Sequence, residues 1–251
     1  TASAMRVFLA ALLAAVSASP VFAQSVPDAR HIDGPPAPAA PAMVARDAAG
    51  RATILTVRLT SPLSLDGRLD EAIYRDVQPI GDFIQQEPFE GQVATEKTEA
   101  WVFFDADNVY VAARNWETDS SRRVMSDMQR DARNLYNNDH FAVLFDTFYD
   151  RRNGYYFYTN AQGGMVDGQL VNEAPNNNWN GVWEVRTANF EGGWSIEFKI
   201  PFRSIRFKEG SDLWGVNFRR IVRWKNEASF LSAVPQSYGR RGLTKVSSAG
   251  T

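Results

Sequence analysis

One ten-residue segment combines the residue types that proteins use to hold sugars. Residues 172–181 read Asn-Glu-Ala-Pro-Asn-Asn-Asn-Trp-Asn-Gly, with five asparagines around one tryptophan, Trp179. An aromatic ring buries the C–H face of a sugar, while amides such as those of Asn172 and Asn178 hydrogen-bond its hydroxyl groups. Two interpretations are open. The segment is a sugar-binding loop in which Trp179 touches little of the core, or it is a turn whose tryptophan caps the edge of a sheet.

The other tryptophans divide between predicted core and predicted rim positions. Trp194 and Trp214 lie on the apolar faces of alternating segments and are predicted to be core residues, as is Trp183 at the start of a strand. Trp224 has Arg220 and Arg223 nearby and is predicted to cover an arginine. Trp116 follows Arg114 at the end of a strand, where the ring faces a ligand from the rim or packs into the core.

Two acidic segments could bind a hard cation such as calcium, which prefers carboxylate, amide and backbone oxygens. Asp105 and Asp107 belong to a short Asp/Asn turn, and Asp146 and Asp150 begin and continue a second polar segment that ends at Asn153. The alternative is that these turns need no metal, because Asp and Asn close turns by bonding their own backbone. Asp146 interrupts an apolar strand and is expected to pair with an arginine, since a lone buried carboxylate is costly.

Cysteine is absent and histidine nearly so, which excludes several kinds of catalytic and metal site. His31 lies in a Pro-rich region, so His140 is the one histidine of the predicted domain, and a zinc site cannot be assembled from it. His140 follows Asp139 at a strand start and is expected to pair locally. Glycoside hydrolysis needs two carboxylates at a defined separation, but 29 acids spread along the chain select no pair. We therefore predict no catalytic residue.

The first residues have the pattern of a secretory signal. Met5 and Arg6 give a basic start, residues 7–16 are apolar but too few to span a membrane, and Ala23 ends a stretch suited to signal-peptidase cleavage. Residues 1–4 precede this start. We expect export to the periplasm, the outer membrane or the cell surface. The formal charge is −2, a near balance that argues against a nucleic-acid partner, because nucleic-acid binders carry a basic face.

Composition divides the rest of the chain into three parts. Residues 24–51 are rich in Ala and Pro and are predicted to be a flexible linker, because such residues bury little surface. A domain is predicted over residues 52–237. Residues 238–251 are polar and rich in Gly and Ser, and we expect them to begin a truncated C-terminal region.

The elements that would position these residues are mostly strands. Trp194, Ile196 and Phe198 alternate with polar residues. Phe141, Val143 and Phe145 form a second apolar face, although Leu144 and Phe148 make the other side of that segment partly apolar too. Further strands are predicted within 53–59, 95–104, 109–116, 155–159, 182–187 and 214–224. Short helices are predicted at 70–74 and 122–132. Many strands with turns between them predict an all-β fold, an antiparallel β-sandwich with jelly-roll or immunoglobulin-like layering.

Six pieces of sequence occur in an order that is typical of one family. Residues 65–74 read Leu-Asp-Gly-Arg-Leu-Asp-Glu-Ala-Ile-Tyr and are followed by the predicted hairpin at 95–116; the remaining pieces are 139–148, 150–155, 193–202 and 214–220. Over about residues 53–235 the chain resembles the family 9 carbohydrate-binding module. More narrowly, it resembles the module-9-like domain that begins a group of bacterial outer-membrane-associated proteins whose C-terminal half is uncharacterised.

This resemblance implies a non-catalytic domain that binds a polysaccharide or oligosaccharide and serves carbohydrate breakdown or uptake. Module-9 domains clamp a sugar between two aromatic rings, which implies Trp179 and Trp116 as the pair, with Arg114, Asn172 and Asn178 as hydrogen-bonding groups. They also commonly carry structural calcium. The partner would be the C-terminal outer-membrane segment of the same protein. The alternative is a structural or interaction domain of that protein that has kept the sandwich and lost the sugar site.

Overall fold

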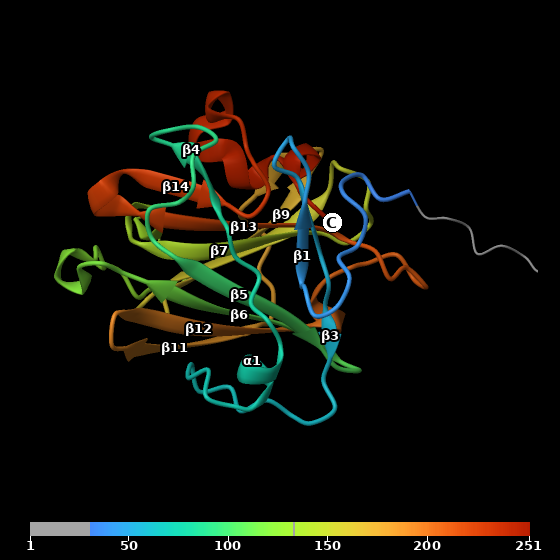
Figure 1. Cartoon of the computed structure of the whole chain (residues 1–251), viewed down its shortest axis with the longest axis horizontal. Helices are drawn as coiled ribbons and strands as arrows, with labels where there is room; N and C mark the ends of the chain where they lie inside the picture. Colours follow the sequence, from blue (N-terminus) through green and yellow to red (C-terminus); the bar gives the residue numbers. More distant parts are fainter. Residues whose placement is uncertain (1–30, 133) are drawn as a thin grey trace, which may run out of the picture. The chain divides into compact units, whose positions relative to one another are not determined.

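Alternating apolar residues build two sheets that face each other in the computed structural model, which describes residues 31–132 and 134–251 (Figure 1). Hydrogen-bonded neighbours in the seven-stranded sheet run in the order β10 (Ala174–Asn176), β9 (Met165–Val171), β8 (Gly154–Asn160), β7 (His140–Asp146), β13 (Gly215–Val222), β14 (Glu227–Phe230) and β4 (Ile84–Glu87). The five-stranded sheet has the order β11 (Glu184–Phe190), β12 (Gly193–Pro201), β6 (Asn108–Trp116), β5 (Thr98–Phe104) and β3 (Val57–Arg58). All pairs are antiparallel except β3 with β5.

The main core lies between the two sheets and follows the alternation of the sequence. Phe141, Val143 and Phe145 of β7 meet the inward side chains of β12, which include Trp194 and Phe198. The predicted sandwich and the core positions of Trp194 and Trp183 are confirmed. Trp214 is only partly buried and packs at the edge of this core. Because successive strand residues point to opposite faces, each sheet also has an outer face that needs its own covering.

The segment 65–74 covers the outer face of the five-stranded sheet. Leu69 and Tyr74 pack there on Trp101 and Phe103, and α1 (Ile73–Asp76) forms at its end. The buried carboxylate of Glu197 on β12 accepts hydrogen bonds from the segment: the amide of Gly67 at 2.8 Å, the amide of Asp66 at 3.0 Å and the hydroxyl of Tyr74 at 2.7 Å. The function of this segment in the fold is thus structural: residues 65–74 attach to the outer face of the five-stranded sheet through Glu197.

The predicted helix at 122–132 is wrong. Only η1 (Ser120–Arg122), a turn of 3-10 helix, forms near it, because backbone amides that a helix would use bond to side chains instead. The amide of Val124 donates to Asp139 and that of Ser126 donates to Asn138. The other 3-10 turns are η2 (Leu135–Asn137), η3 (Phe202–Ser204), η4 (Arg223–Lys225), η5 (Gln236–Thr244) and η6 (Val246–Ser248). Within the described residues, no helix has both the length and the apolar character needed to cross a membrane.

Both ends of the predicted domain extend further than the composition indicated. Val44–Arg46 forms β1 and pairs with β2 (Ala52–Ile54), so this part of the predicted linker belongs to the folded unit, which spans residues 32–251. Arg46 explains the attachment, because its guanidinium donates to the carbonyl oxygens of Leu231, Gly81 and Asp82. The predicted signal segment lies outside the described residues.

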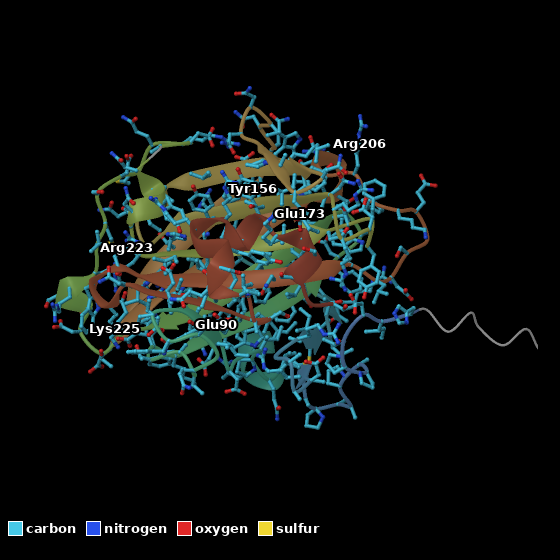
Figure 2. The ribbon with its side chains drawn as sticks, turned by 90° about the horizontal axis from the view of Figure 1, so that it is seen from above. Glu90, Tyr156, Glu173, Arg206, Arg223 and Lys225 are labelled. Atoms are coloured by element: carbon cyan, nitrogen blue, oxygen red, sulfur yellow. The ribbon has the colours of Figure 1, made fainter. Side chains whose placement is uncertain are left out.

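The C-terminal segment, residues 236–250, lies on the outer face of the seven-stranded sheet. Leu243, Val246 and Ala249 pack there against Leu144, Phe230 and other outward side chains of the sheet. Figure 2, viewed from above, shows this red segment crossing the sheet, with Tyr156 and Glu173 beside it. Glu173 accepts hydrogen bonds from Lys245 at 3.1 Å and from the Ser247 hydroxyl at 2.5 Å. The last residues are thus part of the folded unit.

Candidate functional site

Trp179 packs against the sandwich. Its ring is half-buried, with its centroid 4.9 Å from that of Tyr155 and 6.0 Å from that of Phe157. The expectation that this tryptophan touches little of the core is therefore wrong. Neighbouring asparagines tie the loop to itself and to the sheet: Asn177 accepts a 2.6 Å bond from the hydroxyl of Tyr156, and Asn176 accepts from the amide of Asn178 at 3.2 Å.

Asn172, at the start of the loop, and Asn178, next to Trp179, are both exposed. Asn172 has a left-handed backbone with φ of 52° and donates its amide to the side chain of Asn153 at 3.1 Å. Its backbone therefore fixes the start of the loop. What either side chain binds stays a prediction.

Trp116 and Arg114 lie on the five-stranded sheet and already have partners. The indole nitrogen of Trp116 donates to Glu99 at 2.9 Å, and the ring meets Phe190 edge-on at 4.9 Å. Arg114 donates to the carbonyl of Leu69 at 2.6 Å, which holds the segment 65–74 in place. Glu99 also lines a depression of about 540 Å³, but its carboxylate forms a 2.6 Å ion pair with Lys97, so the charges there are already compensated.

The structure does not bring the two tryptophans to one site. Trp116 pairs with Gly193 at the start of β12. Trp179 contacts Phe157, which contacts Trp183, and Trp183 stacks on Phe198 toward the other end of β12. Phe198 lies five residue steps from Gly193 along β12, roughly 17 Å at the strand rise of 3.3–3.4 Å. One sugar ring cannot contact both tryptophans, so the predicted clamp is wrong.

The four acidic candidates for calcium serve mainly in turns. Asp105 accepts bonds from the amides of Asp107 and Asn108 and from the hydroxyl of Tyr110, each at 2.7 Å. Asp107 is exposed. In the described part of the chain, no group of three or more His, Cys, Asp or Glu side chains is placed to hold a metal ion. Calcium binding stays a prediction.

Asp146 and Asp150 build the second acidic segment around backbone amides. Asp146 is fully buried, and burial raises the pKa of its carboxyl group. Its oxygens accept from the backbone amides of Asp150 and Arg151 at 3.1 and 2.8 Å. The expected pairing with an arginine is therefore made through the backbone amide of Arg151 and not through a guanidinium. Asp150 in turn accepts from Asn153, at 2.8 Å from the amide and 2.6 Å from the side chain.

A different group of residues meets on the outer face of the seven-stranded sheet. We call it the tyrosine–arginine cluster; its members are Tyr136 of η2, His140 of β7, Tyr158 of β8, Arg219 of β13 and Arg240 of η5. The guanidinium carbon of Arg219 lies 5.0 Å from the ring centroid of Tyr136 and 5.9 Å from that of Tyr158. Both rings are half-buried, whereas Arg219 is only 3% exposed.

His140 joins the cluster as a neutral ring. Its Nδ1 lies 2.9 Å from the carbonyl oxygen of Asn138 and its Nε2 lies 2.8 Å from Nη2 of Arg219. These partners assign the proton to Nδ1, so that Nε2 accepts from the guanidinium. Burial and, secondly, the charge of Arg219 hold the pKa of His140 well below its usual range. The expected local pairing is confirmed by the contact with Asn138, whereas the carboxylate of the adjacent Asp139 accepts from the amides of Arg223 and Val124.

Arg219 carries a buried positive charge without an acidic partner. Among the described residues, neither a hydrogen bond nor an ion pair joins it to a carboxylate, and its Nε has no acceptor. Burial lowers the pKa of Arg219, yet a guanidinium stays protonated in proteins. The ring faces of Tyr136 and Tyr158 and the lone pair of His140 stabilise the charge instead. A buried charge with a perturbed pKa is a criterion for a candidate functional site.

The exposed side of the cluster is formed by Arg240. Its guanidinium carbon lies 4.1 Å from the ring centroid of Tyr136, and its Nη2 donates to the side chain of Asn137 at 3.3 Å. Aromatic rings, a guanidinium and an amide are therefore within reach of one ligand. This group was missed in the sequence analysis because its members come from five elements that span residues 136–240. One signal was available, the pair Arg219-Arg220 in an apolar strand, which alternation must place on opposite faces.

Comparisons with known proteins agree with this architecture. The sequence profile described as "Carbohydrate family 9 binding domain-like" matches residues 65–229, which includes most of both sheets. No curated protein sequence matches the chain significantly.

Solved structures share the fold at low sequence identity. A family 9 carbohydrate-binding module from Caldicellulosiruptor kristjanssonii in complex with cellotriose is 14% identical, with a TM-score of 0.54, covering 78% of this chain and 90% of that one. A family 9 module from the same organism in complex with glucose gives 14% identity and a TM-score of 0.55, with 78% and 92% covered. A structure from Bacteroides uniformis gives 11% identity and a TM-score of 0.57, with 78% and 95% covered.

Proposed function

The chain belongs to the carbohydrate family 9 binding domain-like family, and from this membership we propose that it binds a saccharide at the tyrosine–arginine cluster. The family consists of non-catalytic binding modules, in agreement with the prediction that the chain is not an enzyme. Two structural relatives hold cellotriose and glucose. These are the ligand types to test first.

The observation that carries the proposed site is the buried guanidinium of Arg219 between two half-exposed tyrosines. The rings of Tyr136 and Tyr158 offer apolar area for the C–H face of a sugar. Arg240 and Asn137 lie at the exposed side and supply donors and an acceptor for hydroxyl groups. Arg219 and His140 lie beneath the rings and hold them in place. Because the guanidinium of Arg240 lies over the ring of Tyr136, this exposed side chain must move aside for a sugar to stack there.

The test is a glycan array, followed by titration of the full chain with glucose and cellotriose. Tyr136→Ala removes a contacting ring and is expected to weaken binding at least tenfold, whereas Tyr136→Phe keeps the ring and retains most of the affinity. Arg240→Ala is expected to cost several-fold in affinity. Its matched control is Arg241→Ala, an exposed arginine next in the chain.

Thermal melting of each variant separates loss of binding from loss of folding. Binding that survives Tyr136→Ala and Arg240→Ala unchanged would place the sugar elsewhere. Arrays read with added calcium and with a chelator test whether calcium supports binding, which we propose on the family resemblance.

A second function is favoured by the C-terminal segment. Leu243, Val246 and Ala249 cover much of the same sheet face, an arrangement suited to a structural or interaction domain that does not bind sugar. No bound glycan on the array, from a chain that melts cooperatively, would support this function. In either case we propose that the protein is exported, on the signal-like pattern of residues 5–23, and that it acts at the outer membrane. A sugar-binding domain would serve carbohydrate breakdown or uptake there.

A further inference from the structure

A separate depression of about 270 Å³ opens beside the start of β8. No member of the tyrosine–arginine cluster lines it. The side chains that matter to its chemistry are those of Phe148, Asn153, Tyr155, Gln169 and Arg206.

Hydrogen bonds fix the walls of this depression. The hydroxyl of Thr147 donates to the carbonyl of Arg206 at 2.5 Å, and the amide of Arg206 donates to the hydroxyl of Tyr155 at 3.2 Å. The chain after β7 and the chain after η3 are thereby held side by side. On the opposite wall, Asp150 and Asn153 close a turn on themselves through the bonds already described. The carboxylate of Asp150 is thus engaged by its own turn.

Three groups at the depression remain available to a ligand. Phe148 is 41% exposed, so part of its ring is open to a ligand. The Arg206 guanidinium is exposed, and within residues 31–132 and 134–251 neither it nor the side-chain amide of Gln169 has a hydrogen bond or ion pair. An exposed ring with an unpaired guanidinium and an unpaired amide is the combination that recognises a sugar: an apolar face and planar hydrogen-bonding groups.

We propose that this depression is a second saccharide site, which takes one terminal sugar ring. Its volume lies just below the roughly 300–1,000 Å³ of sites that enclose small molecules, so it suits one ring rather than an oligosaccharide. Phe148 covers the C–H face, and Arg206 and Gln169 bond the hydroxyls. The site does not depend on the tyrosine–arginine cluster.

Titration of the ¹⁵N-labelled full chain with glucose, followed by NMR, tests the proposal. Saturable shifts are expected at the side-chain amide of Gln169. Phe148→Ala is expected to weaken that response at least tenfold, and Arg206→Ala several-fold. The matched controls are Phe89→Ala, which removes a phenylalanine that is 66% exposed, and Arg203→Ala, which removes an exposed arginine of the same segment. Both should retain the wild-type response.

The result also separates the two proposed sites. The side-chain amide of Asn137 reports the tyrosine–arginine cluster, and Tyr136→Ala should abolish only that response. Shifts at Gln169 without shifts at Asn137 would support the second site and overturn the first. An unresponsive Gln169 at saturating glucose, or an unchanged response in Phe148→Ala, overturns the second site whatever happens at Asn137.

Discussion

Replacing His140 by glutamine should make the folded protein less sensitive to acid. His140 lies under the cluster with Arg219 of β13, Tyr136 of η2 and Tyr158 of β8 around it. Burial and the charge of Arg219 hold its pKa well below the usual range, so the folded state stays neutral where the unfolded chain takes up a proton. The stability that this neutral ring contributes is present above the unfolded pKa near 6.5 and is lost as the pH falls toward the folded pKa.

The expected loss of stability corresponds to one proton, which His140 takes up only in the unfolded chain. Each pH unit in this window lowers the free energy of unfolding by about 1.4 kcal/mol. Between pH 7 and pH 5 the single-site expression gives about 2 kcal/mol for an unfolded pKa of 6.5. For a folded unit of this length that corresponds to a decrease in Tm of about 4–8 °C.

Urea unfolding at pH 7 and pH 5 measures this difference. Glutamine offers a donor for Asn138 and an acceptor for Arg219 but does not titrate, so His140→Gln should lose about 2 kcal/mol less than wild type over this interval. The contribution of carboxylate titration to the loss of stability is the same in both proteins, so it cancels in the difference between them. His31→Gln, at an exposed histidine, is the control and should behave as wild type. Equal losses in wild type and His140→Gln would show that the folded protein accepts the proton, which refutes the buried neutral ring.

Two further substitutions test the packing that positions the loops. Trp179→Ala removes the half-buried ring that contacts Tyr155 and Phe157, and it should lower the free energy of unfolding by about 2–3 kcal/mol in urea. An unchanged urea midpoint would show that the ring is not packed. Gly67→Ala places a Cβ 2.6 Å from the backbone of Thr187 at φ +86° and should cost about 2 kcal/mol or more. Gly91→Ala, at φ +80° with open space around the Cβ, should cost less; equal costs would contradict the steric explanation.

The sandwich could be predicted because its signal is local. Inward and outward residues alternate along β7 and β12, and this period of two survives whatever packs on either side. The helix prediction for residues 122–132 failed because the structure there depends on distant residues. Two of its backbone amides bond to the side chains of Asp139 and Asn138, and no local pattern shows a partner that lies a dozen residues away. The C-terminal segment offered a weak signal, since Leu243, Val246 and Ala249 are spaced by three and form one apolar face.

The candidate site was harder to predict because the residues that stand out in the sequence are not the residues that form the site. Trp179 and Trp116 stand out in the sequence, but each is already packed against its own sheet. The tyrosines and arginines of the cluster are ordinary in composition, and they meet only when η2, β8, β13 and η5 are brought together.

The pair Arg219-Arg220 shows what distinguishes the candidate site from the rest of the fold. Both side chains are buried on the same strand, and alternation sends them to opposite faces. Arg220 lies over the ring of Trp194 and forms an ion pair with Glu117 at 3.4 Å, so its charge is balanced within the fold. Arg219 has tyrosine rings and a neutral histidine, which stabilise the cation without neutralising it. Arg219 therefore fixes two half-exposed tyrosine rings from below while its charge stays uncompensated, and this favours the outer face of the seven-stranded sheet over the tryptophan-bearing loops.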